Sequence, residues 1–269
     1  MQRQIILITG CQRSGTTLLH LILDSHPENT GINENDFRFH HFNSYLYAPH
    51  LPPHVSFKLP RYAPIFPFIR GLPGLKLLWC IRNPLDVIYS MITLKIAYGR
   101  NMEIPWAAHP ETARAEIYNC YWVLSDDAKR NLARHMNEYQ QVAAREPMEC
   151  GRRELIYSAA LCWRIKNELA LEYPAAGFQY HAVRYEELVS NPQDTIRATL
   201  DYVGLPWHDD VLRHHELHDG LSSGKTDCSK PITTDRLGGG MKYFFAEDLN
   251  LITDICGDLP ERWGYSIKG

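Results

Sequence analysis

The sequence predicts an α/β fold with a central parallel sheet flanked by helices, and two observations lead to this prediction. Two apolar runs, Ile5–Thr9 and Leu75–Arg82, lack the alternation of polar and apolar residues that marks a half-exposed strand. Each run leads through a polar turn into an apolar helix. In open α/β sheets of this kind, ligands bind at the carboxyl ends of the strands.

The first strand ends in a turn that resembles a phosphate-binding loop. Gly10 and Gly15 have the spacing of the ATP-binding loop, but Thr16 stands in the position of its lysine and Arg13 lies inside the turn. We expect a helix over residues 16–24, directly after the turn. A turn followed by a helix amino terminus offers N–H groups and a positive dipole end to an anion. The stretch therefore predicts a local anion site.

The second strand also ends in residues suited to an anion. Asn83 is a good N-cap, Pro84 takes the first helical position, and Asp86 favours the helix amino end. Arg82 stands at the strand end, and Ser90 lies two helical turns beyond the cap on the same face. Arginine with a nearby hydroxyl suits forked recognition of a phosphate.

The remaining elements complete a single α/β domain over residues 1–269. A short strand is expected near 55–58, a helical stretch over 111–173, then a fourth strand and a helix after Gly177, and a polar loop over 222–240. We expect a nucleotide half at about 1–93 and 177–245, and a helical acceptor-side insertion at about 94–176.

The composition excludes several classes of protein. The chain is 45% hydrophobic and 22% charged, with a net charge of −3, which argues against disorder and against a global basic field for nucleic acid or membrane. Seven cysteines without metal spacing indicate reduced core thiols, and we expect no metal site. No signal-peptide pattern and no membrane-length apolar run occur, so we expect a cytoplasmic protein.

Taken together, the two turns resemble those of the sulfotransferases that use 3′-phosphoadenosine 5′-phosphosulfate (PAPS). The stretch GCQRSGTTLLHLILDSHP is similar to the family's 5′-phosphosulfate loop, in an R-S-G-T-T form. The stretch LLWCIRNPLDVIYSM is similar to its 3′-phosphate segment, in which a serine follows an arginine after eight residues. FKLP and VRYEELVSNPQDTIRATLDYVGLP resemble further elements of the family, with FKLP pointing to its bacterial and tyrosylprotein-type branches.

The resemblance implies roles for individual residues and PAPS as co-substrate, with adenosine 3′,5′-bisphosphate (PAP) as product and no divalent metal. The phosphosulfate would be held by the loop, the 3′-phosphate by the second turn and the adenine by Tyr185. A loosely similar carboxyl-terminal loop adds two candidates near the 3′-phosphate. The loop residues are Arg13, Ser14, Gly15, Thr16 and Thr17, and those of the second turn are Arg82 and Ser90. The two candidates in the carboxyl-terminal loop are Arg236 and Gly238.

The resemblance also suggests how the chemistry would run. An acceptor oxygen or nitrogen attacks sulfur in line, and negative charge builds on the bridging oxygen of the leaving group. Arg13 and Lys58 are the expected cations at that oxygen. Glu34 is the expected general base, with His40, His41 and His109 as alternatives.

We therefore expect a sulfotransferase that acts on a hydroxyl or amine of a small-molecule acceptor. Residues 31–54 and 94–150 are the expected acceptor pocket. An atypical phosphate-loop kinase or NTPase is one alternative, disfavoured by Thr16 and by the lack of a second acidic motif for magnesium. A nucleotide-binding protein without catalysis is the other. The sequence leaves the oligomeric state open, a homodimer included.

Overall fold

The computed structural model describes residues 3–38, 40, 42–69 and 71–267. The chain divides into two compact units. The first comprises Met1–Ile81 and Tyr173–Asp235, and the second comprises Arg82–Glu172 and Arg236–Gly269. These divisions fall after residues 81, 172 and 235, whereas the expected halves divide after 93, 176 and 245. A single domain over the whole chain stays a prediction.

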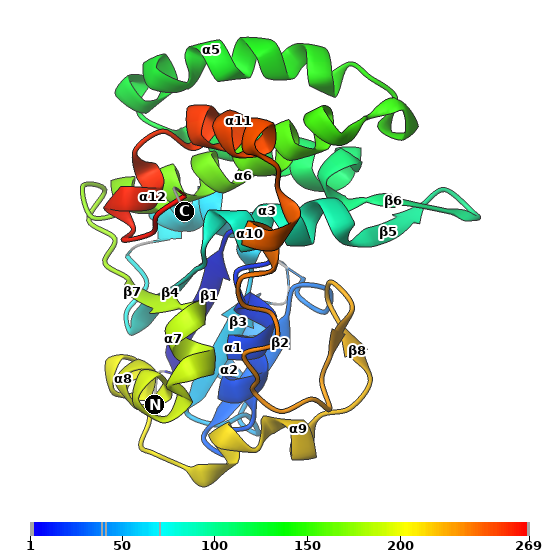
Figure 1. Cartoon of the computed structure of the whole chain (residues 1–269). Coiled ribbons are helices and arrows are strands. Elements are labelled where there is room, and N and C mark those ends of the chain that lie inside the picture. The colour runs from blue at the N-terminus through cyan, green and yellow to red at the C-terminus, as the bar shows by residue number, and fades with distance from the viewer. Residues whose placement is uncertain (1–2, 39, 41, 70, 268–269) are drawn as a thin grey trace. The chain divides into compact units, whose positions relative to one another are not determined.

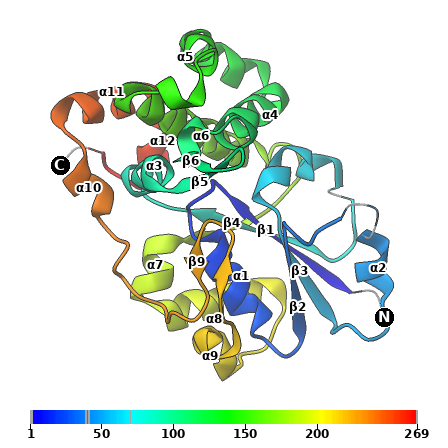
Figure 2. The same ribbon diagram turned by 90° about the vertical axis from the view of Figure 1, so that its right-hand side faces the viewer.

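The first unit contains a five-stranded sheet in which all neighbouring strands are parallel (Figures 1 and 2). The strand order is β2-β3-β1-β4-β7. The strands are β1 (Gln4–Gly10), β2 (Asn29–Asn33), β3 (His54–Lys58), β4 (Leu75–Ile81) and β7 (His181–Arg184). This confirms the predicted α/β class with a central parallel sheet.

Helices cover this sheet and bury its apolar strands. The helices of the unit are α1 (Thr16–Asp24), α2 (Phe42–Tyr47), α7 (Tyr185–Ser190), α8 (Pro192–Val203) and α9 (His214–Leu217), with 3₁₀ turns at Pro60–Ile69 and Asp209–Leu212. Ile6 and Ile8 of β1 pack with Leu19 of α1 and Leu200 of α8 in one fully buried cluster. A two-stranded hairpin, β8 (Leu221–Ser222) with β9 (Thr226–Asp227), follows α9.

The second unit is mainly helical. Its helices are α3 (Pro84–Thr93), α4 (Ala115–Val123), α5 (Asp126–Ala143), α6 (Arg152–Glu172), α10 (Gly239–Tyr243), α11 (Ala246–Cys256) and α12 (Leu259–Arg262), with short turns at Trp106–Ala108, Pro110–Arg114 and Pro147–Glu149. An antiparallel pair, β5 (Lys95–Tyr98) with β6 (Met102–Pro105), completes it. Lys166 of α6 and Glu116 of α4 form a buried ion pair at 2.6 Å.

Several boundaries follow from local chemistry. The helix expected over 16–24 is α1, and the strand expected over 75–82 is β4, one residue shorter. Asn83 caps α3 by accepting a hydrogen bond from the Leu85 N–H at 2.9 Å, as expected. The prediction missed β2, because its residues Asn29–Asn33 include two asparagines and a glycine, which are depleted in strands. Parallel pairing with β3 forms this strand.

Two further properties bear on the class of protein. The seven cysteines are free thiols, and all except Cys150 are buried. Among the described residues, no helix has both the length and the apolar character that a membrane crossing requires.

Candidate active site

The turn after β1 is shaped by close approaches that only glycine permits. Gly10 pairs with Cys80 of β4, and a Cβ atom at Gly10 would lie 2.2 Å from the Cys80 carbonyl oxygen. Gly15 has φ of +91° and serves as the N-cap of α1, without a side-chain cap. Arg13 also has a positive φ, +70°, although it is not glycine. The backbone thus turns sharply and aims the first N–H groups of α1 out of the sheet edge.

The side chains of this turn provide further hydrogen-bond donors. Ser14 is 1% exposed, and its hydroxyl has no hydrogen-bond partner among the described residues. The amide nitrogen and oxygen of Gln12 are likewise buried without a partner in the described part of the chain. Buried polar groups are normally paired, so these atoms fit a site that is completed by a polar ligand. A phosphate or sulfonate group has the acceptor oxygens that the serine hydroxyl and the α1 N–H groups need.

A buried lysine lies beside the start of α1. Lys58 ends β3, where it is in register with Ile8 of β1 and Asn33 of β2. Its Nζ donates to the Thr17 hydroxyl at 3.3 Å and forms an ion pair with Glu34 Oε1 at 3.1 Å. The structure thus brings together three of the predicted residues, from three separate elements of the first unit.

The two members of this pair differ in burial. Burial lowers the pKa of Lys58, and the Glu34 carboxylate opposes that shift. The Lys58 side chain is 1% exposed and that of Glu34 is 16% exposed, while the second carboxylate oxygen, Oε2, has no hydrogen-bond partner among the described residues. The lysine therefore holds one carboxylate oxygen, and the other is a buried hydrogen-bond acceptor.

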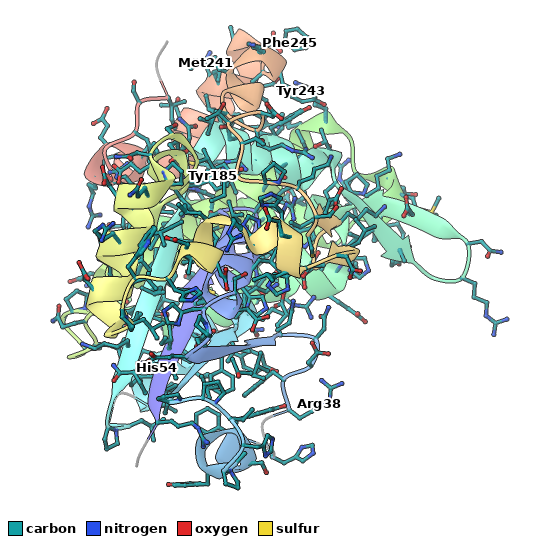
Figure 3. All side chains as sticks on the ribbon, turned by 90° about the horizontal axis from the view of Figure 1, so that it is seen from below. Arg38, His54, Tyr185, Met241, Tyr243 and Phe245 are labelled. Atoms are coloured by element: carbon teal, nitrogen blue, oxygen red, sulfur yellow. The ribbon has the colours of Figure 1, made fainter. Side chains whose placement is uncertain are left out.

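Tyr185, labelled in Figure 3, begins α7, and its ring packs against the turn. A Cβ atom at Gly15 would lie 2.5 Å from Tyr185 Cδ2, so the ring touches the loop backbone. The ring is 8% exposed. Its predicted contact with adenine stays a prediction, and the structure adds a packing role that requires glycine at position 15.

The second unit contains a separate cluster around the start of α3. Arg82 is 7% exposed, and its Nη2 donates to the Arg236 carbonyl and lies 3.5 Å from Asp86 Oδ2. Asp86 in turn accepts hydrogen bonds from the backbone N–H groups of Gly238, at 3.0 Å, and Gly240, at 2.9 Å. One buried carboxylate thus joins α3 to the segment at the start of α10, which comprises the N-cap Gly238 and the helical Gly240.

Glycine is needed in that segment for two different reasons. Gly238 has φ of +70° and caps α10, and a Cβ atom there would meet nothing within 4 Å. Gly240 has no such backbone constraint, but its Cβ atom would lie 2.3 Å from the Leu85 backbone. Tyr89 lies 3.2 Å from the corresponding position of Gly239. Beyond it, Met241, Tyr243 and Phe245 are exposed (Figure 3).

The other predicted site residues divide between the two units. Ser90 lies on α3, half-buried, in the same unit as Arg82 and Arg236. His109 is in the second unit, where its Nδ1 accepts a hydrogen bond from the Glu111 N–H at 3.2 Å and so caps a helical turn. His40 is exposed, and His41 lies outside the described residues. Among the base candidates that the structure describes, Glu34 pairs with Lys58.

Sequence reasoning overlooked the roles of Asp86 and Gly240. Asp86 was expected only to favour the helix amino end, yet its carboxylate accepts from two backbone N–H groups about 150 residues away. The run of three glycines, 238–240, was the available signal, because consecutive glycines often mark a close approach of two backbones.

Comparisons with known proteins agree with this architecture. A family model described as a sulfotransferase domain matches residues 3–226. The chain belongs to the sulfotransferase family. In an alignment 305 positions long, gaps included, it is 23% identical to protein-tyrosine sulfotransferase 2 of Gallus gallus, and the alignment covers 97% of this chain and 69% of that protein.

Two solved sulfotransferase domains share the fold. The domain from the olefin synthase of Synechococcus PCC 7002 superimposes with a TM-score of 0.53 at 16% identity, over 98% of this chain and 94% of that one. The domain from the curacin biosynthetic pathway gives a TM-score of 0.50 at 14% identity, over 99% of both chains. The sulfotransferase domain that matches residues 3–226 makes the protein a transferase of that type, which decides against the kinase and the non-catalytic alternatives.

Proposed function

We propose that this sulfotransferase takes its sulfonate from PAPS and transfers it to a hydroxyl or amine of an acceptor. The observation that carries the proposal is the group formed by Lys58, Glu34 and Thr17 at the end of the phosphate loop. It combines a buried cation, a carboxylate with one oxygen that has no hydrogen-bond partner among the described residues, and a hydroxyl at a helix amino terminus. Family membership supports PAPS as the donor.

The proposed reaction is a single in-line displacement. The acceptor oxygen or nitrogen forms a bond to sulfur, and the bond between sulfur and the bridging oxygen of PAPS breaks, which releases PAP. The acceptor proton passes to Glu34 Oε2. Arg13 and Lys58 stabilise the charge that develops on the leaving oxygen, and the N–H groups of α1 with Ser14, Gly15, Thr16 and Thr17 hold the 5′-phosphosulfate.

Recognition of the rest of the nucleotide is assigned to the other predicted residues. Arg82 and Ser90 bind the 3′-phosphate, aided by the segment with Arg236 and Gly238, and Tyr185 lies near the adenine. Arg82 suits this role because its guanidinium is oriented by Asp86 and by the Arg236 carbonyl. The positive charge comes from side chains, so no metal is assigned a role.

The acceptor is proposed at the level of its reacting group. A small-molecule alcohol, phenol or amine is the first candidate. A tyrosine hydroxyl of a protein is the second, favoured by the similarity to a protein-tyrosine sulfotransferase. Assays with labelled PAPS against small phenols, alcohols and amines, and against tyrosine-containing peptides, distinguish the two.

A thermal-shift comparison tests the donor directly. A ligand that binds only the native state raises the melting temperature more, the more tightly it binds. PAP should therefore raise it more than ATP with magnesium, because the proposed site is built for the 5′- and 3′-phosphates of PAP. The labelled PAPS assay should show transfer in the presence of a chelator. A larger shift with ATP and magnesium, or no transfer to any acceptor class, would contradict the proposal.

A further inference from the structure

The β8–β9 hairpin lies in the first unit and contains an unusual turn. It comprises residues 221–227, and its base is closed by a hydrogen bond from the Cys228 N–H to the Gly220 carbonyl at 3.0 Å. In Figures 1 and 2 it follows α9 along the chain. At its tip, Gly224 has φ of +71° and Lys225 has φ of +57°. A lysine in this backbone region costs about 1–2 kcal/mol relative to a right-handed conformation.

The tip of the hairpin holds the arginine of the phosphate loop. Arg13 Nη1 donates to the Gly224 carbonyl at 3.1 Å. Arg13 and Lys225 are the two non-glycine residues with positive φ in the described part of the chain. The hydrogen bond connects Arg13 to Gly224, the residue before Lys225. The accepting oxygen belongs to the Gly224–Lys225 peptide, so the left-handed Lys225 helps to fix its direction. Strain of this kind is typical of functional sites.

Glycine at position 224 is required by the arginine itself. A Cβ atom there would lie 2.0 Å from Arg13 Nη1 and 3.2 Å from its Cζ. The guanidinium therefore lies directly against the hairpin backbone. An alanine would displace the guanidinium, the turn, or both.

The same hairpin also binds both neighbours of the proposed base. Asn33 Nδ2 donates to the Ser222 hydroxyl at 3.1 Å, and the Ser223 hydroxyl donates to Asn33 Oδ1 at 3.1 Å. Asn35 Nδ2 donates to the Ser223 hydroxyl at 3.4 Å. Glu34 lies between these two asparagines, so the hairpin fixes the short segment that carries its carboxylate.

We propose that the β8–β9 hairpin is a positioning element for sulfonate transfer, with Gly224 acting through Arg13 and with Ser222 and Ser223 acting through Glu34. One element of about seven residues would set the position of the cation and of the base together. The proposal rests on the function proposed above, because it needs Arg13 and Glu34 to act on the reacting atoms. It predicts a larger effect on the rate of transfer than on nucleotide affinity.

The decisive experiment is a double-mutant cycle of Gly224→Ala with Arg13→Ala. Alone, Gly224→Ala should lower kcat about 10- to 100-fold, the effect of a misplaced catalytic group, and change the dissociation constant of PAP less than about 3-fold. In the Arg13→Ala background it should have little further effect, since Gly224 acts through that side chain. The matched control is Gly204→Ala, which places the same left-handed strain (φ of +78°) in open space and should keep the wild-type kcat.

A second cycle covers the case in which Gly224→Ala does not fold. The double variant Ser222→Ala/Ser223→Ala removes only hydroxyls and should lower kcat about 5- to 10-fold, with no further loss in a Glu34→Gln background. The proposal would be overturned if the losses in kcat were additive in whichever of the two cycles can be measured. It would also be overturned if PAP affinity fell in proportion to kcat. Failure of the wild-type protein to bind PAP or transfer sulfonate would instead refute the proposed function.

Discussion

The two proposed phosphate-binding regions are built in different ways. The loop after β1 is formed by neighbours in the chain, since Gly10, Arg13, Gly15 and the start of α1 lie within a few residues of one another. The cluster around Arg82 joins segments about 150 residues apart through the Asp86 carboxylate. The first region depends on backbone geometry and the second on one charged side chain. The two regions can therefore be tested separately, at Lys58 in the first and at Gly240 and Asp86 in the second.

The largest effect is expected from Lys58→Ala in the first region. Removing the buried cation should lower kcat about 100- to 1000-fold, the usual cost of deleting one group that stabilises developing negative charge. PAP affinity should fall far less, because the α1 N–H groups remain. Steady-state kinetics and calorimetry with PAP measure the two effects.

Lys76→Ala is the control for that variant. Lys76 is on β4 in the same unit, with its Nζ 5.0 Å from the centre of the Tyr202 ring. It should keep the wild-type kcat. Equal losses in both variants would remove the basis for assigning Lys58 to the reaction.

The next largest effect is expected from Gly240→Ala in the second region. Its Cβ atom would overlap the Leu85 backbone, which neither helix can relieve without moving, so stability should fall by about 3 kcal/mol. Gly238→Ala places its Cβ in open space and should cost only the left-handed strain, about 1 kcal/mol. Denaturant unfolding compares the two variants, and equal costs would show that the close approach to α3 is not maintained.

A smaller effect is expected from Asp86→Asn. The amide can accept from only one of the two glycine N–H groups and loses its charge interaction with Arg82, so PAP affinity should fall about 10-fold, from the loss of charge-assisted hydrogen bonds. Calorimetry with PAP measures it. Asp194→Asn is the control, because Asp194 is an exposed residue in the first turn of α8, and this variant should bind PAP as the wild type does. Unchanged affinity in Asp86→Asn would contradict the anchoring role.

The smallest expected effect is a pH dependence of stability that comes from His20 in the first unit. Burial, with Lys58 and His218 nearby, lowers the pKa of His20 to about 3. The unfolded state thus binds a proton at higher pH than the native state, so stability is complete above about pH 6.5 and falls as the pH drops. The loss from His20 should be about 1 kcal/mol between pH 6.5 and 5.5. His20→Gln should reduce this slope, and an unchanged slope would exclude His20 as its source.

The contrast between the two regions also explains how far the sequence could be interpreted. The R-S-G-T-T turn, α1 and the Asn83 cap depend on adjacent residues, so their pattern was visible. The pairing of Lys58 with Glu34 depends on the register of β2 and β3, and β2 itself was missed. Contacts such as Asp86 with Gly238 or Arg13 with Gly224 join distant segments, and one sequence does not show which distant segment a glycine run such as 238–240 meets.

The central claim is that one donor nucleotide needs both regions, its 5′-phosphosulfate at the loop and its 3′-phosphate at Arg82. Calorimetry with PAP and with adenosine 5′-monophosphate, in the wild type and in Arg82→Ala, tests it most directly. The wild type should bind PAP at least about 10-fold more tightly than the monophosphate, as expected for a charge-assisted contact to one more phosphate, and Arg82→Ala should lose that preference. Equal affinity for the two nucleotides in the wild type, or an undiminished preference in the variant, would contradict it.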